Sequence, residues 1–164
     1  MPEKAKENSE LNIKDPYRAY NFKLLIGEIT EGHFMECSGM DIRINTIAYR
    51  ETGPADGPGN PGYLRKIPGP VEYGDIVLKY GLTDSDTLWN WFMTGVEGNI
   101  ERKNITIQLL DSAGSSVVMQ WDLIGAWASQ WKGAHLDAMG REIAIESLTV
   151  VYENLIRSGG GGGK

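Results

Sequence analysis

The chain has 164 residues, of which 41% are hydrophobic and 23% charged, which fits one globular domain that buries about 70% of its unfolded surface. The formal net charge of -6 and the scattered Lys and Arg residues argue against a dedicated nucleic-acid-binding protein. No apolar run approaches the roughly 18 residues of a membrane-spanning helix. The first ten residues, MPEKAKENSE, hold no signal-peptide core, so we expect synthesis to end in the cytoplasm.

Alternating apolar and polar residues predict half-buried β-strands along much of the chain. The pattern first occurs in residues 20–26 and returns in residues 76–82 and 105–109. Gly, Asp or Asn residues bound each of these stretches, as they commonly bound strands. We therefore expect a mainly antiparallel β fold.

Residues 42–51 are expected to form a strand that turns through a long loop and returns as a second strand near 63–67. The apolar side chains of the first strand change phase between Ile44 and Ile47, so neither face of this hairpin is cleanly polar. An isolated hairpin is marginal in water. The pattern therefore indicates a projecting arm that a neighbouring subunit covers.

The loop of this hairpin contains DGPGNPG, residues 56–62, which matches the G-x-G-x-x-G pattern of dinucleotide-binding folds. That pattern binds phosphate where its glycines lead directly into a helix. Pro68 and Pro70 exclude a helix after the loop, and Pro58 and Pro61 remove two N–H donors within it. We therefore expect no nucleotide site here.

One segment has the spacing of an amphipathic helix. The apolar residues that fall at helical intervals are Leu88, Trp91, Phe92 and Val96. Thr83, Asp84 and Asp86 precede them and suit an N-terminal cap at the positive end of the helix. Gly98 is a natural stop, so we expect a single helix that ends shortly before it.

Two further strands are expected at residues 117–131 and 143–152. In the first, Gly125 falls on the apolar phase, which indicates a bend or a close backbone approach. In the second, the apolar phase changes, which predicts a β-bulge near Glu146 and Ser147.

No pattern of residues singles out an active site. His33 and His135 stand alone, and no His or Cys has metal-ligand spacing, so we expect no metal and no cofactor. We interpret Cys37 as a buried strand residue rather than a nucleophile. One alternative is an enzyme with a pocket around one of the histidines. The other is a small-ligand-binding β-barrel whose lumen is lined by Trp121, Trp127 and Trp131.

A series of short blocks covers nearly the whole chain. In order they are DPYRAYNF (15–22), CSGM (37–40), AYRE (48–51), KIPGPVEYGDIVLKYGLT (66–83), LWNWF (88–92), IERKNITIQLLDSAG (100–114), GAWASQWKGAHLDAMG (125–140) and EIAIESLTVVYENL (142–155). No block is specific alone, but the ordered set resembles the inner tube proteins of contractile tails, found in contractile phages and in extracellular injection systems. Ile67, Pro70 and the Pro- and Gly-rich loop at 53–62 depart from the family pattern.

The resemblance implies a non-enzymatic structural subunit with an antiparallel β-barrel or sandwich, one flanking α-helix and a long protruding β-hairpin. Such subunits form six-membered rings that stack into a hollow tube, and the joined sheets of neighbouring subunits line the lumen. A sheath surrounds the tube, baseplate and terminator proteins adjoin it, and cargo or DNA passes through it. The resemblance thus implies a protein made in the bacterial cytoplasm that becomes part of a phage virion or a released injection particle.

The resemblance also implies that function lies in surfaces. The expected domains are a flexible N-terminal arm at 1–14, a tail-tube domain at 15–157 and a flexible Gly-rich tail at 158–164. Candidate lumen residues are Thr106 and Gln108. Candidate residues of the subunit and inter-ring interfaces are Tyr17, Tyr20, Ile42, Ile44, Ile47, Tyr49, Tyr63 and Leu64.

Overall fold

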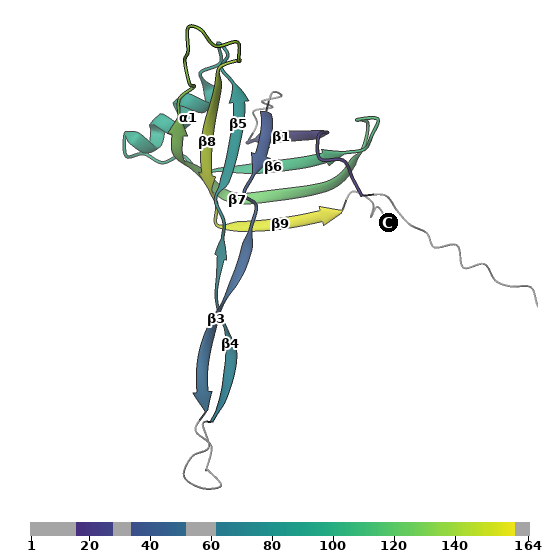
Figure 1. The fold of residues 1–164 in the computed structure, drawn as a ribbon, viewed down its shortest axis with the longest axis vertical. Helices are drawn as coiled ribbons and strands as arrows, with labels where there is room; N and C mark the ends of the chain where they lie inside the picture. Colours follow the sequence, from purple (N-terminus) through teal and green to yellow (C-terminus); the bar gives the residue numbers. More distant parts are fainter. Residues whose placement is uncertain (1–15, 28–33, 52–61, 160–164) are drawn as a thin grey trace, which may run out of the picture.

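The structure is a computed structural model that describes residues 16–27, 34–51 and 62–159. In chain order its elements are β1 (Phe22–Ile26), β2 (Phe34–Ser38), β3 (Ile42–Glu51), β4 (Tyr63–Tyr73), β5 (Ile76–Gly81), α1 (Thr87–Val96), β6 (Lys103–Leu110), β7 (Val117–Lys132), β8 (Ile145–Val151) and β9 (Asn154–Gly159). The expected antiparallel β fold with one helix is confirmed (Figure 1). His33, the arm at 1–14 and most of the hairpin loop lie outside the described residues, as does the side chain of Tyr63.

Seven strands form one strongly bent sheet in the order β1-β6-β7-β8-β5-β2, and β9 also pairs with β7. The 16-residue strand β7 belongs to both halves, because its first part pairs with β6 and β9 and its last part with β8. Gly125 marks the change with φ of +65°, and a β-carbon there would lie 3.0 Å from the Glu153 carboxylate. The predicted bend at this glycine is therefore confirmed.

The bend also changes which side chains of β7 face the core. Leu123 is buried before the bend, whereas Ala126 and Ala128 are buried after it. Trp127, expected on the same face as Leu123, therefore lies on the opposite face. A register shift between Ala128 and Gln130 then returns Trp131 to the core side.

The bulge predicted near Glu146 and Ser147 is wrong. β8 pairs with β5 in unbroken register from Ile145 to Val150, and the irregularity lies in β7 instead. Ile143 misled the prediction because it is 65% exposed and precedes the strand. Ile143 therefore lies in the loop before β8 and not in the core.

The core lies between the two halves of the bent sheet. Its largest fully buried side chains are Leu24, Ile26, Ile76, Leu78, Ile105, Leu123, Leu148 and Val150. Helix α1 adds Leu88 and Trp91, and the Trp91 indole donates a hydrogen bond of 2.8 Å to the carbonyl oxygen of Glu101. Among the described residues no helix has the length and apolar character needed to cross a membrane.

The helix ends at Val96, shortly before the predicted stop at Gly98, but its expected side-chain cap is not formed. Asp86 is the N-cap residue, yet its side chain makes no capping hydrogen bond. Instead, the Thr83 hydroxyl accepts a hydrogen bond of 3.3 Å from the Ser85 backbone N–H, one turn before the helix. The residue types therefore predicted correctly where the helix ends, but the capping hydrogen bond that they predicted is not formed.

Strands β3 and β4 form a separate two-stranded sheet that projects far from the body (Figure 1). The predicted protruding hairpin is confirmed, and its return strand continues to Tyr73, beyond the expected range. A register shift between Ile44 and Thr46 coincides with the phase change seen in the sequence.

Strand β9 was not expected. The last predicted strand ended at residue 152, and Ser158 and Gly159, assigned to the tail, are the final residues of β9. The sequence NLIRSG has no alternation of apolar residues that would mark a strand.

Candidate functional site

The residue types that bind metal ions are not assembled into a site within the described ranges. There, no group of three or more His, Cys, Asp or Glu side chains could hold a metal ion. Cys37 is half-buried in β2, and burial raises the pKa of its thiol to about 11. The thiol is therefore protonated at neutral pH, whereas a nucleophilic cysteine requires a lowered pKa.

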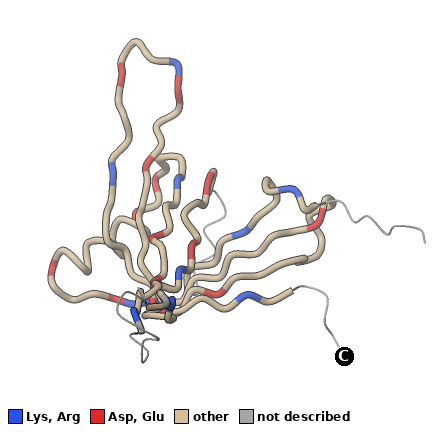
Figure 2. Tube along the Cα trace, turned by 60° about the horizontal axis from the view of Figure 1, so that its bottom comes forward, with Lys and Arg blue, Asp and Glu red and all other residues tan. Residues whose placement is uncertain are grey.

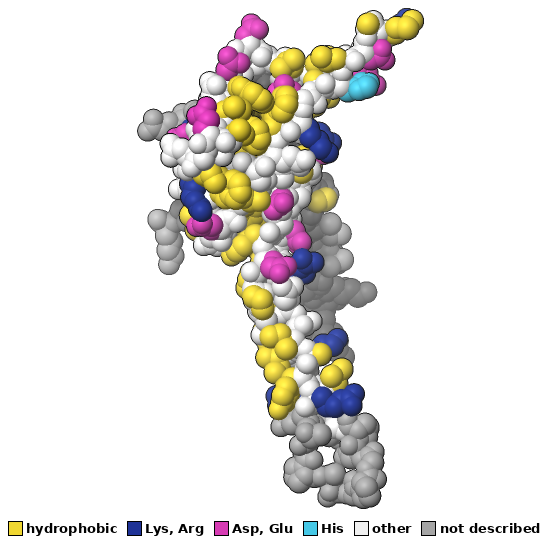
Figure 3. All heavy atoms as spheres, turned by 90° about the vertical axis from the view of Figure 1, so that its left-hand side faces the viewer, with side chains coloured by type: hydrophobic (Ala, Val, Ile, Leu, Met, Phe, Trp, Pro, Cys, Tyr) yellow, Lys and Arg dark blue, Asp and Glu magenta, His cyan; other side chains and the backbone are white. Residues whose placement is uncertain are grey.

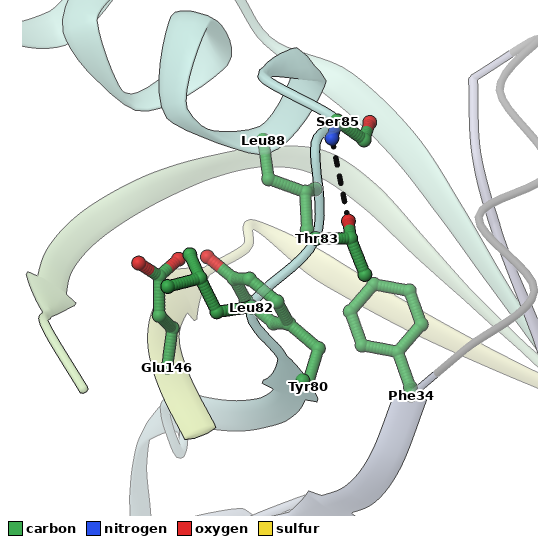
Figure 4. Close-up of a pocket in the computed structure, with 8 residues that line it drawn as sticks. Phe34, Tyr80, Leu82, Thr83, Ser85, Leu88 and Glu146 are labelled. Carbon is green, nitrogen blue, oxygen red and sulfur yellow. Dashed lines mark hydrogen bonds between the residues drawn. The ribbon is translucent and has the colours of Figure 1, made fainter. Parts of the chain in front are cut away.

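A small cavity near the start of α1 is too small for a substrate. Its lining includes the apolar side chains of Phe34, Tyr80, Leu82 and Leu88 and the carboxylate of Glu146 (Figure 4). The rings of Phe34 and Tyr80 meet edge to face with centroids 5.8 Å apart. The cavity volume of about 40 Å³ compares with the several hundred of a typical ligand pocket.

The three tryptophans of the ligand-binding alternative do not line a common lumen. Trp121 faces an apolar surface groove of about 370 Å³ that also touches Cys37 and Phe22. Trp131 instead meets the ring of Trp89 edge to face, with ring centroids 4.7 Å apart. Trp127 lies on the face of β7 opposite to the buried Ala126 and Ala128. The arrangement on which that alternative depended is therefore not formed.

The half-sheet β1-β6-β7-β9 has a core-facing side and an outer side. The outer side, which we call the polar face, carries Lys23 on β1, Thr106 and Gln108 on β6, Gln120 and Asp122 on β7, and Ser158 on β9. Strand register brings them into rows, because Gln108 pairs with Lys23 and Gln120, and Thr106 pairs with Asp122. The alternate residues Ile105 and Ile107 point to the core, which fixes the orientation of this face.

Side-chain hydrogen bonds connect the centre of the polar face. The Thr106 hydroxyl donates to the Asp122 carboxylate at 2.7 Å, and the Gln108 amide donates to the Gln120 carbonyl oxygen at 3.1 Å. The Gln120 amide in turn donates to both Asp122 oxygens at 3.0 Å. These hydrogen bonds link the four side chains into one network that holds them along the sheet.

Thr106 and Gln108 thus share one face as expected, and Gln120 and Asp122 are members that the sequence analysis missed. The available signal was their place in the polar phase of residues 117–131. Lys23 and Asp122, the ionisable members of the polar face, carry opposite charge. Figure 2 shows acidic and basic positions spread along these strands rather than gathered into one patch.

The same half-sheet has two edges without a pairing partner. Within the described residues β1 pairs with β6 alone and β9 pairs with β7 alone. The two edge strands have similar lengths, five and six residues. Exposed strand edges present unpaired N–H and C=O groups and are templates for pairing with another chain.

The hairpin exposes a run of large hydrophobic side chains. Seven of the eight residues expected at an interface have described side chains, and these are exposed: Tyr17 and Tyr20 before β1, and Ile42, Ile44, Ile47, Tyr49 and Leu64 on the hairpin. Ile67 and Val71 on β4 are exposed as well and extend the set. Figure 3 shows hydrophobic side chains following the hairpin along one side, and exposed apolar surface of this kind is typical of an interaction surface.

Most of the sequence matches a known protein family. Residues 18–156 match the family described as T4-like virus tail tube protein gp19. This chain belongs to that family. Tail tube proteins are structural rather than enzymatic, so the chain is a structural component of a phage tail or a contractile injection particle. No curated protein sequence matches the chain.

Solved structures of injection systems share the fold of this tail tube protein. The anti-feeding prophage cap, which terminates a tube, has a TM-score of 0.80 at 25% identity, covering 94% of this chain and 99% of the other. A chain of the PVC sheath-tube complex in its extended state has a TM-score of 0.78 at 26% identity, covering 94% of this chain and 99% of the other. The PVC sheath/tube terminator has a TM-score of 0.77 at 28% identity, covering 89% of this chain and 99% of the other. The resemblance seen in the sequence is therefore confirmed at the level of family and fold.

Proposed function

We propose that the chain is the repeating subunit of the inner tube of a contractile tail or injection system, and that it forms stacked six-membered rings around a hollow lumen. The observation that carries this proposal is the half-sheet β1-β6-β7-β9, which combines a polar outer face with two unpaired edges. A sheet with two open edges is completed by joining copies side by side until the ring closes.

Strand direction favours this closure. Every pair in the half-sheet is antiparallel, so directions alternate from β1 through β6 and β7 to β9. Because the number of strands is even, a copy related by rotation brings its β1 antiparallel to the neighbour's β9. The ring then continues one antiparallel ladder without a change of pairing type.

The polar face would line the lumen. Its opposite charges on Lys23 and Asp122 leave no strong field of either sign, and its central side chains are occupied by hydrogen bonds to one another. Such a wall attracts neither anionic nor cationic cargo strongly. Passage of a protein cargo or DNA without retention is the behaviour expected of it.

The remaining surfaces would serve assembly. The hairpin residues Ile42, Ile44, Ile47, Tyr49, Tyr63 and Leu64 would be buried between rings. Tyr17 and Tyr20 would anchor the N-terminal arm, and the Arg18 guanidinium donates a hydrogen bond of 3.1 Å to the Tyr20 hydroxyl. The tube would be surrounded by a sheath and adjoined by baseplate and terminator proteins, after synthesis in the bacterial cytoplasm.

Negative-stain electron microscopy of the purified chain over a range of concentrations tests this function. We expect six-fold rings with a central hole and, at higher concentration, stacked tubes. Analytical ultracentrifugation provides the matching mass. A population that stays monomeric at every concentration, also after addition of preformed ring seeds, would contradict the proposal.

A further inference from the structure

The loop between β7 and β8, residues 133–144, exposes large hydrophobic side chains at the end of the molecule opposite the hairpin (Figures 1 and 3). Leu136 is 79% exposed, Met139 93% and Ile143 65%. The loop has internal order, because the Met139 N–H donates to the Asp137 carboxylate at 3.0 Å and the Gly140 N–H to the Asp137 carbonyl at 3.1 Å. Apolar side chains held at such exposure mark an interaction surface.

Acidic side chains surround this loop. A hydrogen bond of 2.9 Å from the Leu82 N–H to the Ala144 carbonyl joins the loop to the connection between β5 and α1. We call the loop and this connection the receiving end. Its charged residues are Asp84, Asp86, Asp137, Arg141 and Glu142, and the adjoining strand ends add Lys132 of β7 and Glu146 of β8. The receiving end is therefore predominantly acidic.

The far half of the hairpin has the complementary character. Arg50, Arg65 and Lys66 lie on neighbouring strand pairs there, beside the exposed Ile47 and Tyr49. In Figure 3 basic and hydrophobic side chains share this part of the hairpin. Near the base of the hairpin, Arg43 and Glu72 form an ion pair at 3.0 Å.

We propose that the receiving end binds the far half of the hairpin of a second copy of this chain, stacked along the long axis of the molecule. The inference rests on the proposed tube and names the surface that accepts the hairpin in the next ring. The two surfaces lie at opposite ends of the molecule, so the contact is head to tail and repeats without limit, as a growing tube requires. Burial of the exposed apolar side chains would stabilise the contact, and the opposite charges of the two surfaces would make it specific.

Charge reversal on each surface tests the contact. One variant combines Arg50→Glu with Lys66→Glu, a second combines Asp84→Lys with Glu142→Lys, and a third carries all four changes. We expect rings from every variant, a tenfold or larger rise in the concentration needed for tubes in the first two, and tubes near the wild-type concentration in the third. Electron microscopy and sedimentation at low ionic strength provide the readout.

Two further variants separate charge from folding. Arg43→Glu with Glu72→Arg exchanges the ion pair at the hairpin base, and we expect wild-type stacking from it. Met139→Asp alters the most exposed loop residue, and we expect rings that do not stack. If Met139→Asp or the receiving-end reversal stacks like the wild type, the inference is wrong, and it is equally wrong if the fourfold variant is not rescued. Absence of rings from the wild type would instead overturn the proposed function itself.

Discussion

At the scale of single residues, Asp111 closes the turn between β6 and β7 through its carboxylate. It accepts hydrogen bonds from the Ser116 hydroxyl at 2.7 Å, the Ser115 N–H at 2.9 Å and the Ser115 hydroxyl at 3.2 Å. The Ser116 hydroxyl first, and then the Ser115 N–H, lower the pKa of Asp111 from 3.8 to about 2. The turn sets the register of the two strands that carry the centre of the polar face.

A folded-state pKa below the unfolded value has a defined consequence for stability. The contribution of Asp111 is fully present above pH 4 or so and is lost as the pH falls through about 2. We therefore expect Asp111→Asn to melt a few degrees below the wild type at neutral pH, with the difference shrinking as the pH falls from 4 to 2. Thermal unfolding followed by circular dichroism measures this, with Asp84→Asn as the control outside the turn. A difference that stays constant over this range would contradict the assignment.

At the scale of elements, the hairpin depends on a close backbone crossing at its base. Gly39, between β2 and β3, has φ of +93°, and a β-carbon there would lie 2.3 Å from the Asp75 carbonyl oxygen. Next to it, the Asp41 carbonyl oxygen accepts hydrogen bonds from the Gly74 N–H at 2.8 Å and the Tyr152 hydroxyl at 3.5 Å. These contacts fix the direction in which the hairpin leaves the body.

We expect Gly39→Ala to lower the free energy of unfolding by about 2 kcal/mol or more, because both the positive φ and the carbonyl contact must change. Gly81→Ala is the matched control, since nothing lies within 4 Å of its added β-carbon and its φ is not positive. For it we expect a change within about 0.5 kcal/mol. Denaturant unfolding measures both. Equal unfolding midpoints for the two variants would show that the crossing is not rigid.

The elements also show what the sequence can predict. Periodicity placed Leu24, Ile26 and Ile105 in strands and in the core because alternation reports burial directly. The prediction placed Trp127 on the wrong face of β7 because Gly125, at positive φ, changes which alternate residues face the core. Alternation alone does not show at which residue such a change occurs. The sequence therefore predicts strands well and their continuation through a bend poorly.

The polar face was predictable only in part for a related reason. Thr106 and Gln108 could be named from their own strand, but their contacts with Asp122 and Gln120 depend on the register across the turn at Asp111. Strand β9 had no periodic signal and is held in place by pairing with β7. Its edge, which matters most for assembly, is thus a property of the folded sheet rather than of the local sequence.

At the scale of the whole molecule, ring closure would bring the two outer strands of the polar face together. Strand register places Leu25 of β1, Thr106, Asp122 and Ile156 of β9 in one row across this face. Leu25 is half-buried and Ile156 is exposed, so the row has an apolar residue at each outer end. In a ring, Ile156 of one copy would adjoin Leu25 of the next and remove both from water.

We therefore expect Leu25→Lys combined with Ile156→Lys to remain monomeric, because like charges would face each other at every junction, whereas Leu25→Lys combined with Ile156→Glu forms rings through an ion pair. The two variants differ at one residue, which controls for the loss of the apolar pair and for any effect of Leu25→Lys on folding. Sedimentation velocity at low ionic strength measures the ring fraction, and circular dichroism checks that both variants fold. Equal assembly of the two folded variants would mean that the junction between subunits does not join β1 to β9 along this row.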